Sequence, residues 1–245
     1  MSRVIYGLNP VSESLRVESS AVEELTLVQG RLSGRIAQVL SLAKAAGVKI
    51  RRRPRSELAR LAGSEAHQGV VLTLGDFSYS GLEEILTPPG PDLLIMLDGI
   101  QDPRNLGAMA RTGLAAGAGG LIIPKDRAAG VTPAAVKVAA GALSRLPVVR
   151  VTNLNRTADL LKKEGFWILG TAPQAPVSLF DLDDLPARLV VIIGAEGRGM
   201  GRALTAKCDF LARLPLPGPV ESLNASAAAA VVLFELVRRR TEKGS

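Results

Sequence analysis

Four glycines and a glutamate follow an apolar run in the segment VIIGAEGRGMG, residues 191–201. Glycine has no side chain, so such a loop lets a ligand approach the bare backbone. The spacing G-x-G-x-G from Gly197 to Gly201 departs from the G-x-G-x-x-G of dinucleotide-binding loops, and the Glu196 carboxylate would repel a pyrophosphate. The loop therefore indicates either a tight structural turn or a site for a ligand with hydroxyl groups or a positive charge. S-adenosylmethionine, a sulfonium without phosphate, fits the second interpretation.

A second segment, DPRNLGAMARTG, places Asn105 where a helix N-cap is expected and Arg111 further along the same helix. Helical side chains lean toward the helix N-terminus, so the long Arg111 side chain can reach back over the preceding loop. An ordinary cap followed by a solvent-facing arginine is the alternative interpretation.

A third segment, LPLPGPVESLNASAAAAVVLFELVRRR, leads through a proline-rich stretch to Ser222, the predicted N-cap of an alanine-rich helix. Helix formation by itself explains the alanines and the arginines near the negative end of the helix dipole. One cap is enough for a helix, however, so Ser222, Asn224 and Ser226 together indicate a binding site at the helix N-terminus.

The elements that must position these residues are visible as six apolar runs, most of them separated by helical patterns. This alternation predicts an α/β fold with a mostly parallel sheet covered on both faces. The runs are DLLIMLD, GGLIIP, LPVVRV, FWILGTA, LVVIIG and FLARLPL. In such sheets ligands bind beyond the carboxyl ends of the strands, so the loops that follow these runs are the predicted location of the chemistry.

The first third of the chain predicts a small, separate α/β unit with a basic surface. The formal net charge of the protein is +7, and residues 1–75 carry 11 lysines and arginines against 6 aspartates and glutamates. Clustered positive charge is typical of proteins with a polyanionic partner. The densest run is expected to contact the phosphates of such a partner, with a solvated basic face as the alternative. This run comprises Arg51, Arg52, Arg53 and Arg55.

Composition also predicts the domain boundaries. Residues 76–91 bring glycine, serine and proline with little periodicity, as a linker does. We therefore expect a basic domain at residues 1–75 and a second domain at residues 92–245.

Other classes of function are disfavoured by what the chain lacks. A single cysteine and a single histidine argue against a disulfide, a cysteine-rich metal site and a Ser/His triad. Cys208 is expected to be a small buried hydrophobe and His67 a turn residue. The sequence holds no run of 18 apolar residues and no secretory signal pattern, so we expect a cytoplasmic protein without membrane or metal partners.

The three segments DPRNLGAMARTG, GAEGRGM and LPLPGPVESLNASAA together resemble the three ordered motifs of the SpoU family of RNA ribose 2′-O-methyltransferases, in the SPOUT class. The resemblance spans roughly residues 91–240. The stretches VIYGLNPV and AHQGVVL are similar to the RNA-binding extension of the bacterial 23S ribosomal RNA guanosine-2′-O-methyltransferases. The resemblance therefore covers nearly the whole chain.

The resemblance implies a catalytic domain tied in a deep trefoil knot, a homodimer, and ribosomal RNA as the substrate. It implies that S-adenosylmethionine is held by Gly170, Thr171, Gly194, Gly197, Gly199, Leu214 and Leu223. The catalytic candidates, matched motif by motif, are Asn105, Arg111, Glu196, Ser222 and Asn224. Arg111 acts either in its own subunit or across the dimer. Glu221 and Ala225 depart from the family pattern, which weakens the assignment of the substrate more than that of the activity.

The implied chemistry moves a methyl group to a ribose hydroxyl, which must lose its proton. A guanidinium stays protonated, so Arg111 is expected to grip a phosphate and stabilise the developing alkoxide, with a phosphate or water as the route for the proton. Methylation of transfer RNA or of the ribosomal site of thiostrepton-resistance enzymes is the alternative reaction. A nonenzymatic ribosome-assembly protein and a dinucleotide oxidoreductase are the alternatives from other classes.

Overall fold

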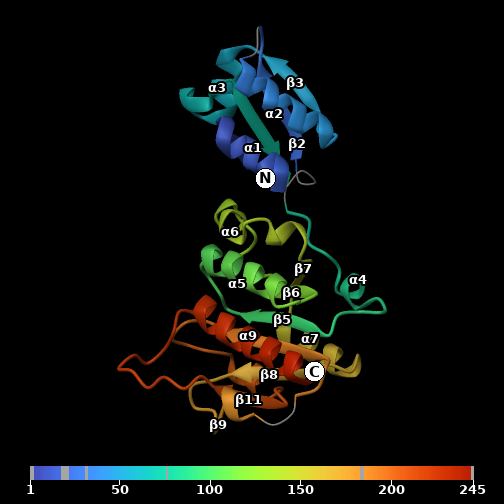
Figure 1. Ribbon diagram of the computed structural model, residues 1–245, viewed down its shortest axis with the longest axis vertical. Helices are drawn as coiled ribbons and strands as arrows, with labels where there is room; N and C mark the ends of the chain where they lie inside the picture. Colours follow the sequence, from blue (N-terminus) through green and yellow to red (C-terminus); the bar gives the residue numbers. More distant parts are fainter. Residues whose placement is uncertain (1–2, 18–21, 31–32, 76, 183–184, 244–245) are drawn as a thin grey trace. The chain divides into compact units, whose positions relative to one another are not determined.

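The computed structural model describes residues 3–17, 22–30, 33–75, 77–182 and 185–243. The chain divides into two compact units, residues 1–78 and residues 79–245 (Figure 1). Each unit has its own sheet and its own cluster of buried apolar side chains.

Unit 1 is built on a four-stranded sheet in the order β1-β4-β2-β3. Strand β4 pairs antiparallel with β1 and β2, whereas β2 and β3 are parallel. The strands are β1 (Arg3–Tyr6), β2 (Val22–Val28), β3 (Ile50–Arg53) and β4 (Val70–Leu74). The helices are α1 (Leu8–Val17), α2 (Gly34–Ala45), α3 (Arg55–Ala62) and the 3-10 turn η2 (Glu65–His67). The predicted small α/β unit is thus confirmed, and its arginine run lies on the edge strand β3 and at the start of α3.

His67 is a buried polar residue of unit 1. Its side chain is fully buried, and its Nδ1 accepts a hydrogen bond from the Gly69 backbone N–H at 3.0 Å. Burial lowers the pKa of His67, and the positive charge of Arg55 adds to this effect. The imidazole is therefore held neutral in the turn that leads into β4, which agrees with the predicted structural role.

Unit 2 is built on a seven-stranded sheet in which every pairing between named strands is parallel. The strand order is β7-β6-β5-β10-β8-β11-β9. The strands are β5 (Leu93–Asp98), β6 (Gly120–Pro124), β7 (Val148–Val151), β8 (Trp167–Thr171), β9 (Val177–Ser178), β10 (Leu189–Gly194) and β11 (Phe210–Arg213). All six predicted runs form strands, and only the two-residue β9, too short to show a pattern, was missed.

Helices cover the sheet of unit 2. The cluster of buried residues on one face draws Ile85, Leu161 and Leu204 from α4 (Leu82–Leu86), α7 (Leu154–Lys163) and α8 (Arg202–Thr205). Helix α5 (Pro103–Ala115) packs against α6 (Pro133–Ala139) and α9 (Ala225–Lys243), and Figure 1 shows α5 and α9 in front of the strands. Short 3-10 turns are η3 (Ala142–Ser144) and η4 (Leu179–Asp181). Helix α4 lies inside the segment predicted as a linker, and its Ile85 is buried in unit 2.

Gly107 sets the distance between α5 and α6. A Cβ atom added at Gly107 would lie 2.2 Å from the backbone oxygen of Ala135 in α6. On the same helix, a Cβ atom at Gly113 would lie 2.3 Å from the Ile95 side chain of β5. The glycines of this motif therefore allow α5 to lie tightly between its neighbours, which fixes the place of its N-terminal turn.

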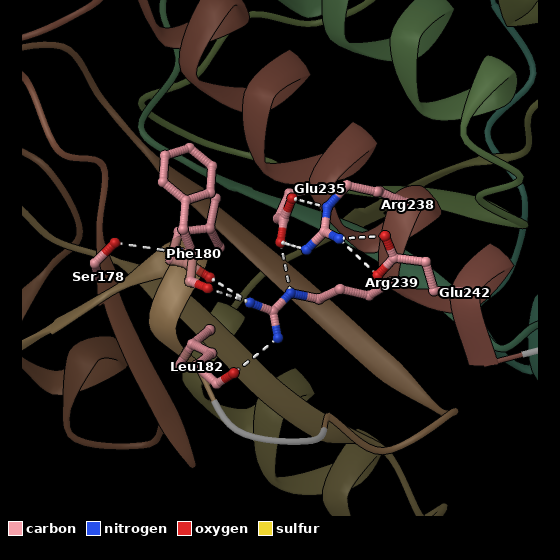
Figure 2. Close-up of polar contacts among 8 residues, drawn as sticks. Ser178, Phe180, Leu182, Glu235, Arg238, Arg239 and Glu242 are labelled. Carbon is pink, nitrogen blue, oxygen red and sulfur yellow. Dashed lines mark hydrogen bonds and ion pairs between the residues drawn. The ribbon is translucent and has the colours of Figure 1, made fainter.

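The arginines near the end of α9 fasten this helix to the β9 region. Figure 2 shows Arg238 and Arg239 converging on Glu235, and Arg239 reaching the backbone oxygens of Phe180 and Leu182. Glu235 is only 7% exposed, and its hydrogen bonds with Arg238 and then Arg239 lower its pKa. The arginines predicted from the dipole alone thus form a hydrogen-bonded anchor that holds α9 in place.

No helix in the described part of the chain combines the length and hydrophobicity needed to cross a membrane. The trefoil knot that the resemblance implies stays a prediction.

Candidate active site

Residues of all three sequence motifs meet in one hydrogen-bonded cluster. Glu196 Oε1 accepts hydrogen bonds from Asn105 Nδ2 at 3.0 Å, from Asn224 Nδ2 at 2.6 Å and from the Ala225 backbone N–H at 2.9 Å. Asn224 Nδ2 also donates to Asn105 Oδ1 at 3.0 Å. A single carboxylate oxygen therefore joins α5, the loop after β10 and the start of α9.

Parallel strands explain why these loops meet. Strand β10 lies between β5 and β8, so the loops that follow these strands emerge at the same edge of the sheet. The loop after β10 is further tied to β5, because the Gly201 backbone N–H donates to Asp98 Oδ2 at 2.6 Å. The sheet thus places motifs that are distant in sequence within hydrogen-bonding distance.

Asn105 is not the N-cap of α5, as the sequence had suggested. Asp102 is the N-cap: its Oδ1 accepts from the Arg104 backbone N–H at 2.8 Å, and Pro103 begins the helix. Proline is suited to the first helical position because no backbone donor is needed there. Asn105 is therefore inside the first turn, and its amide is free to bind Glu196.

Ser222 was likewise wrongly predicted as a cap. Helix α9 begins at Ala225, and Asn224 Oδ1 accepts hydrogen bonds from the backbone N–H groups of Ser226 and Ala227 at 3.0 and 3.3 Å. Asn224 thus caps the helix with its oxygen and binds Glu196 with its nitrogen. An asparagine serves both purposes because its side chain carries both donors and an acceptor.

A cavity of about 440 Å³ opens beside the cluster, at the carboxyl edge of β8 and β10. Six of the seven predicted cofactor residues line it: Thr171, Gly194, Gly197, Gly199, Leu214 and Leu223. Ser222 and Glu196 also contribute to its wall. Gly170 does not line the cavity. A Cβ atom there would lie 2.6 Å from Cys208 Sγ and 2.6 Å from Met200 Cε, so Gly170 is a packing residue behind the site.

The glycines of the loop after β10 have two different reasons to be glycines. Gly194 lies against the loop itself, since a Cβ atom there would be 2.3 Å from the backbone of Gly199. Gly197 and Gly199 have φ angles of +72° and +66°, which L side chains rarely adopt, and no atom lies within 4 Å of their Cβ positions. The loop is therefore a tight turn and also forms part of the cavity wall, while ligand binding by the loop stays a prediction.

A second cavity, of about 360 Å³, lies on the other side of the cluster. It shares Ala195, Glu196 and Ala225 with the first cavity. Its remaining lining is Gly99, Ile100, Gln101, Asp102, Asn105 and Arg198. Two ligands can therefore lie next to each other with Glu196 between them.

Arg111 is exposed on α5 and lines neither cavity. Six residues of helix place its side chain about 120° around the helix axis from that of Asn105. Within the described residues no hydrogen bond or ion pair is found for its guanidinium. Among the catalytic candidates, Arg111 is the one that neither joins the cluster nor lines a cavity, whereas Ser222 lines the 440 Å³ cavity.

The arginine run of unit 1 is largely paired with carboxylates. Arg51 lies 2.8 Å from Glu24, while Arg53 and Arg55 lie 3.6 and 4.0 Å from glutamates at positions 57 and 65. Arg52 is exposed and has no ion pair among the described residues. These are surface pairs, which are weak and easily exchanged for a phosphate.

Cys208 packs against the buried cluster of unit 2, and burial raises the pKa of its thiol to about 11. A thiol with such a pKa is unreactive near neutral pH. Among the described residues, no group of three or more histidine, cysteine, aspartate or glutamate side chains is arranged to hold a metal ion.

The sequence matches two family models. The SpoU rRNA Methylase family matches residues 92–234, and the RNA 2′-O ribose methyltransferase substrate-binding family matches residues 4–80. A protein of Pseudomonas syringae pv. tomato named 23S rRNA (guanosine-2′-O-)-methyltransferase RlmB is 44% identical, covering 98% of this chain and 96% of the relative. A Coxiella burnetii protein of the same name is 42% identical, covering 98% of each chain.

Solved structures agree. The SpoU methyltransferase AviRb from Streptomyces viridochromogenes, in complex with the cofactor AdoMet, superposes with a TM-score of 0.75 at 27% identity, covering 98% of this chain and 91% of that one. An AdoMet-bound rRNA methyltransferase from Sinorhizobium meliloti gives 0.74 at 25% identity, covering 98% and 87%. The parallel α/β fold is thus that of solved methyltransferases. The chain belongs to the SpoU rRNA methylase family, which confirms the resemblance carried by the three motifs.

The double role of Asn224 leads to a stability prediction. Asn224→Ala removes the cap of α9 and should lower the free energy of unfolding of unit 2 by about 1 kcal/mol. Asn224→Ser keeps a capping oxygen but, like alanine, lacks the amide, so it should recover the part of the loss that comes from the cap. Urea unfolding followed by the fluorescence of Trp167, the single tryptophan of the chain, measures both variants. Equal destabilisation by alanine and serine would contradict the capping role.

Proposed function

We propose that this protein transfers a methyl group from S-adenosylmethionine to a ribose 2′-hydroxyl of ribosomal RNA, at a guanosine of 23S rRNA. The observation that carries the proposal is the cluster of Asn105, Glu196 and Asn224 between two adjoining cavities. Such an arrangement suits a reaction that needs a donor and an acceptor side by side. Relatives named as 23S rRNA guanosine-2′-O-methyltransferases, similar over nearly the full chain, support this substrate.

The 440 Å³ cavity is the proposed cofactor site. Its bare Gly197 and Gly199 backbone, the apolar Leu214 and Leu223, and the absence of any lysine or arginine in its lining suit a ligand without phosphate. When bound there, S-adenosylmethionine supplies an electrophilic methyl group. Glu196 is fixed through Oε1 and lines the cavity, and no hydrogen bond to its other oxygen is found within the described residues. The negative carboxylate favours a cationic ligand.

The chain's own residues have separate tasks in this proposal. Asn105 and Asn224 hold Glu196 in place, and the positive end of α9 stabilises its negative charge. Ser222 lies on the wall of the cofactor cavity. Arg111 stabilises the alkoxide that forms as the ribose hydroxyl loses its proton, since the guanidinium remains protonated throughout.

The position of Arg111 favours a homodimer in which this residue serves the partner's site. Helix α9 carries an exposed apolar stripe of Ala227, Val231 and Phe234, and the last two are 38% and 51% exposed. The spacing places these three side chains on one face of the helix. An apolar stripe on a helix that also forms the site is suited to burial against a second copy of the chain.

Unit 1 is the proposed RNA-binding domain, joined near residues 76–91 to the methyltransferase domain, and the protein is proposed to act in the cytoplasm. The match to a substrate-binding family at residues 4–80 and the arginines of β3 support the role of unit 1.

The cofactor assignment predicts the effect of a substitution in the glycine loop. Gly197→Val places a branched side chain in a backbone conformation that suits glycine and into the cavity, so calorimetric binding of S-adenosylmethionine should be lost. Gly218→Val is the matched control, because Gly218 lies outside the cavity lining, has space for a Cβ atom and lacks a positive φ. Both variants should unfold cooperatively. Unchanged affinity in Gly197→Val would rule out this cavity as the cofactor site.

The role of Arg111 predicts a complementation result. Arg111→Ala should lower turnover by about a hundredfold with little change in S-adenosylmethionine affinity. If Arg111 serves the partner's site, mixed dimers of Arg111→Ala and Asn224→Ala subunits contain one intact site and should regain activity. Methyl transfer from labelled S-adenosylmethionine to transcribed 23S rRNA, before and after subunit exchange, measures this. No regain in verified mixed dimers would place Arg111 in its own subunit's site.

The unequal pairing of the arginine run predicts unequal effects on RNA binding. Each phosphate contact that is lost should reduce the slope of log affinity against log salt by about 0.7–0.9. Arg52→Ser should give this full reduction, whereas Arg51→Ser should give less, because Arg51 is partly neutralised by Glu24. RNA affinity across a salt series measures both slopes, with S-adenosylmethionine affinity as the control. Identical slopes for wild type and both variants would mean that the run is only a solvated face.

A further inference from the structure

Arg198 is an unpaired cation at the second cavity. Its side chain is exposed and lines the 360 Å³ cavity, yet no salt bridge or side-chain hydrogen bond ties it to another described residue. By contrast, Arg104 at the same edge is held by Asp102 at 3.1 Å. Arg198 therefore brings a positive charge to this cavity that the described residues leave without a counter-ion.

The backbone around Arg198 directs this charge into the cavity. Its N–H donates to the Glu196 carbonyl oxygen at 2.8 Å, across the turn made by Gly197. A Cβ atom built at Gly99, on the loop after β5, would lie 3.4 Å from the Arg198 guanidinium. Gly99 has a φ of +74°, which favours glycine over residues with a side chain. The lack of a side chain at Gly99 also leaves room for the Arg198 guanidinium.

Each carboxylate of the same cavity already accepts hydrogen bonds from the protein, although none reaches the second oxygen of Glu196 among the described residues. Asp102 accepts hydrogen bonds from the Arg104 backbone and side chain, and these bonds lower its pKa. Glu196 is held through Oε1 by three donors. The cavity thus offers one uncommitted guanidinium, a group that pairs strongly with phosphate.

The position of the proposed cofactor cavity indicates which anion Arg198 would bind. The two cavities share Ala195, Glu196 and Ala225, and Arg198 lines only the one that lies away from the proposed cofactor site. The group that accepts the methyl must lie next to the methyl donor. In RNA, the ribose carbon adjacent to the one that bears the 2′-hydroxyl is linked to a phosphodiester. We propose that the 360 Å³ cavity receives the target ribose and that Arg198 pairs with its backbone phosphate. This inference rests on the proposed function and makes Arg198 a substrate-binding residue.

The test separates RNA binding from cofactor binding. Arg198→Ala should raise the KM for transcribed 23S rRNA about tenfold, the effect of losing one charge-assisted contact. It should also reduce the salt slope of RNA affinity by about 0.7–0.9. Affinity for S-adenosylmethionine should not change. Arg198→Lys keeps the positive charge but lacks the planar guanidinium. It should restore the salt slope fully and reverse the increase in KM only in part.

Arg202→Ala is the matched control, because Arg202 is exposed at the start of α8 and lines neither cavity. Unchanged KM and salt slope in Arg198→Ala would overturn the inference. So would a loss of S-adenosylmethionine affinity without an effect on RNA, which would assign the guanidinium to the cofactor's carboxylate. A wild-type protein that binds RNA without methylating it would contradict the proposed function, while the salt slopes would still decide the role of Arg198.

Discussion

The site depends on one carboxylate oxygen, Glu196 Oε1, that accepts three hydrogen bonds. These bonds come from the first turn of α5 and from the start of α9, while Glu196 itself lies on the loop after β10. Bonds to a charged acceptor are stronger than neutral ones, and the N-terminal dipole of α9 adds to them. The glycine loop, the cap of α9 and the wall between the two cavities are therefore set by one shared interaction.

The parallel sheet makes this interaction possible and places a cavity on each side of Glu196. Strand β10 runs between β5 and β8, so its loop borders the loop of each neighbour. Toward β8 lies a cavity with bare glycine backbone and leucines and no arginine among its described lining residues, and toward β5 lies a cavity lined by the Arg198 guanidinium. The difference in chemistry matches a donor without phosphate on one side and a nucleotide on the other.

The arginines fall into two groups, those whose guanidinium has partners within the described residues and those whose guanidinium has none. Arg239 is engaged by Glu235 and by backbone oxygens, and this anchor fixes the helix that presents Asn224 (Figure 2). Arg52, Arg111 and Arg198 are exposed, and the described residues offer them no ion pair. Unpaired guanidinium groups on a protein with a net charge of +7 are suited to binding a polyanion. Arginines with a structural role thus differ from those proposed to bind substrate in having partners within the described part of the chain.

The sequence by itself determined the strands, the two-unit organisation, the three motifs and their family, because apolar runs and short motifs are local patterns. Only the tertiary structure decided that Asp102 and Asn224 are the caps, since capping depends on where the helix begins, and several nearby polar residues fit the pattern equally well. Gly170 was predicted to touch the cofactor but packs against Cys208, and Arg198 was not singled out at all. Which residues line a cavity depends on how loops that are distant in sequence meet at the sheet edge. The spacing of residues along the chain does not determine these contacts.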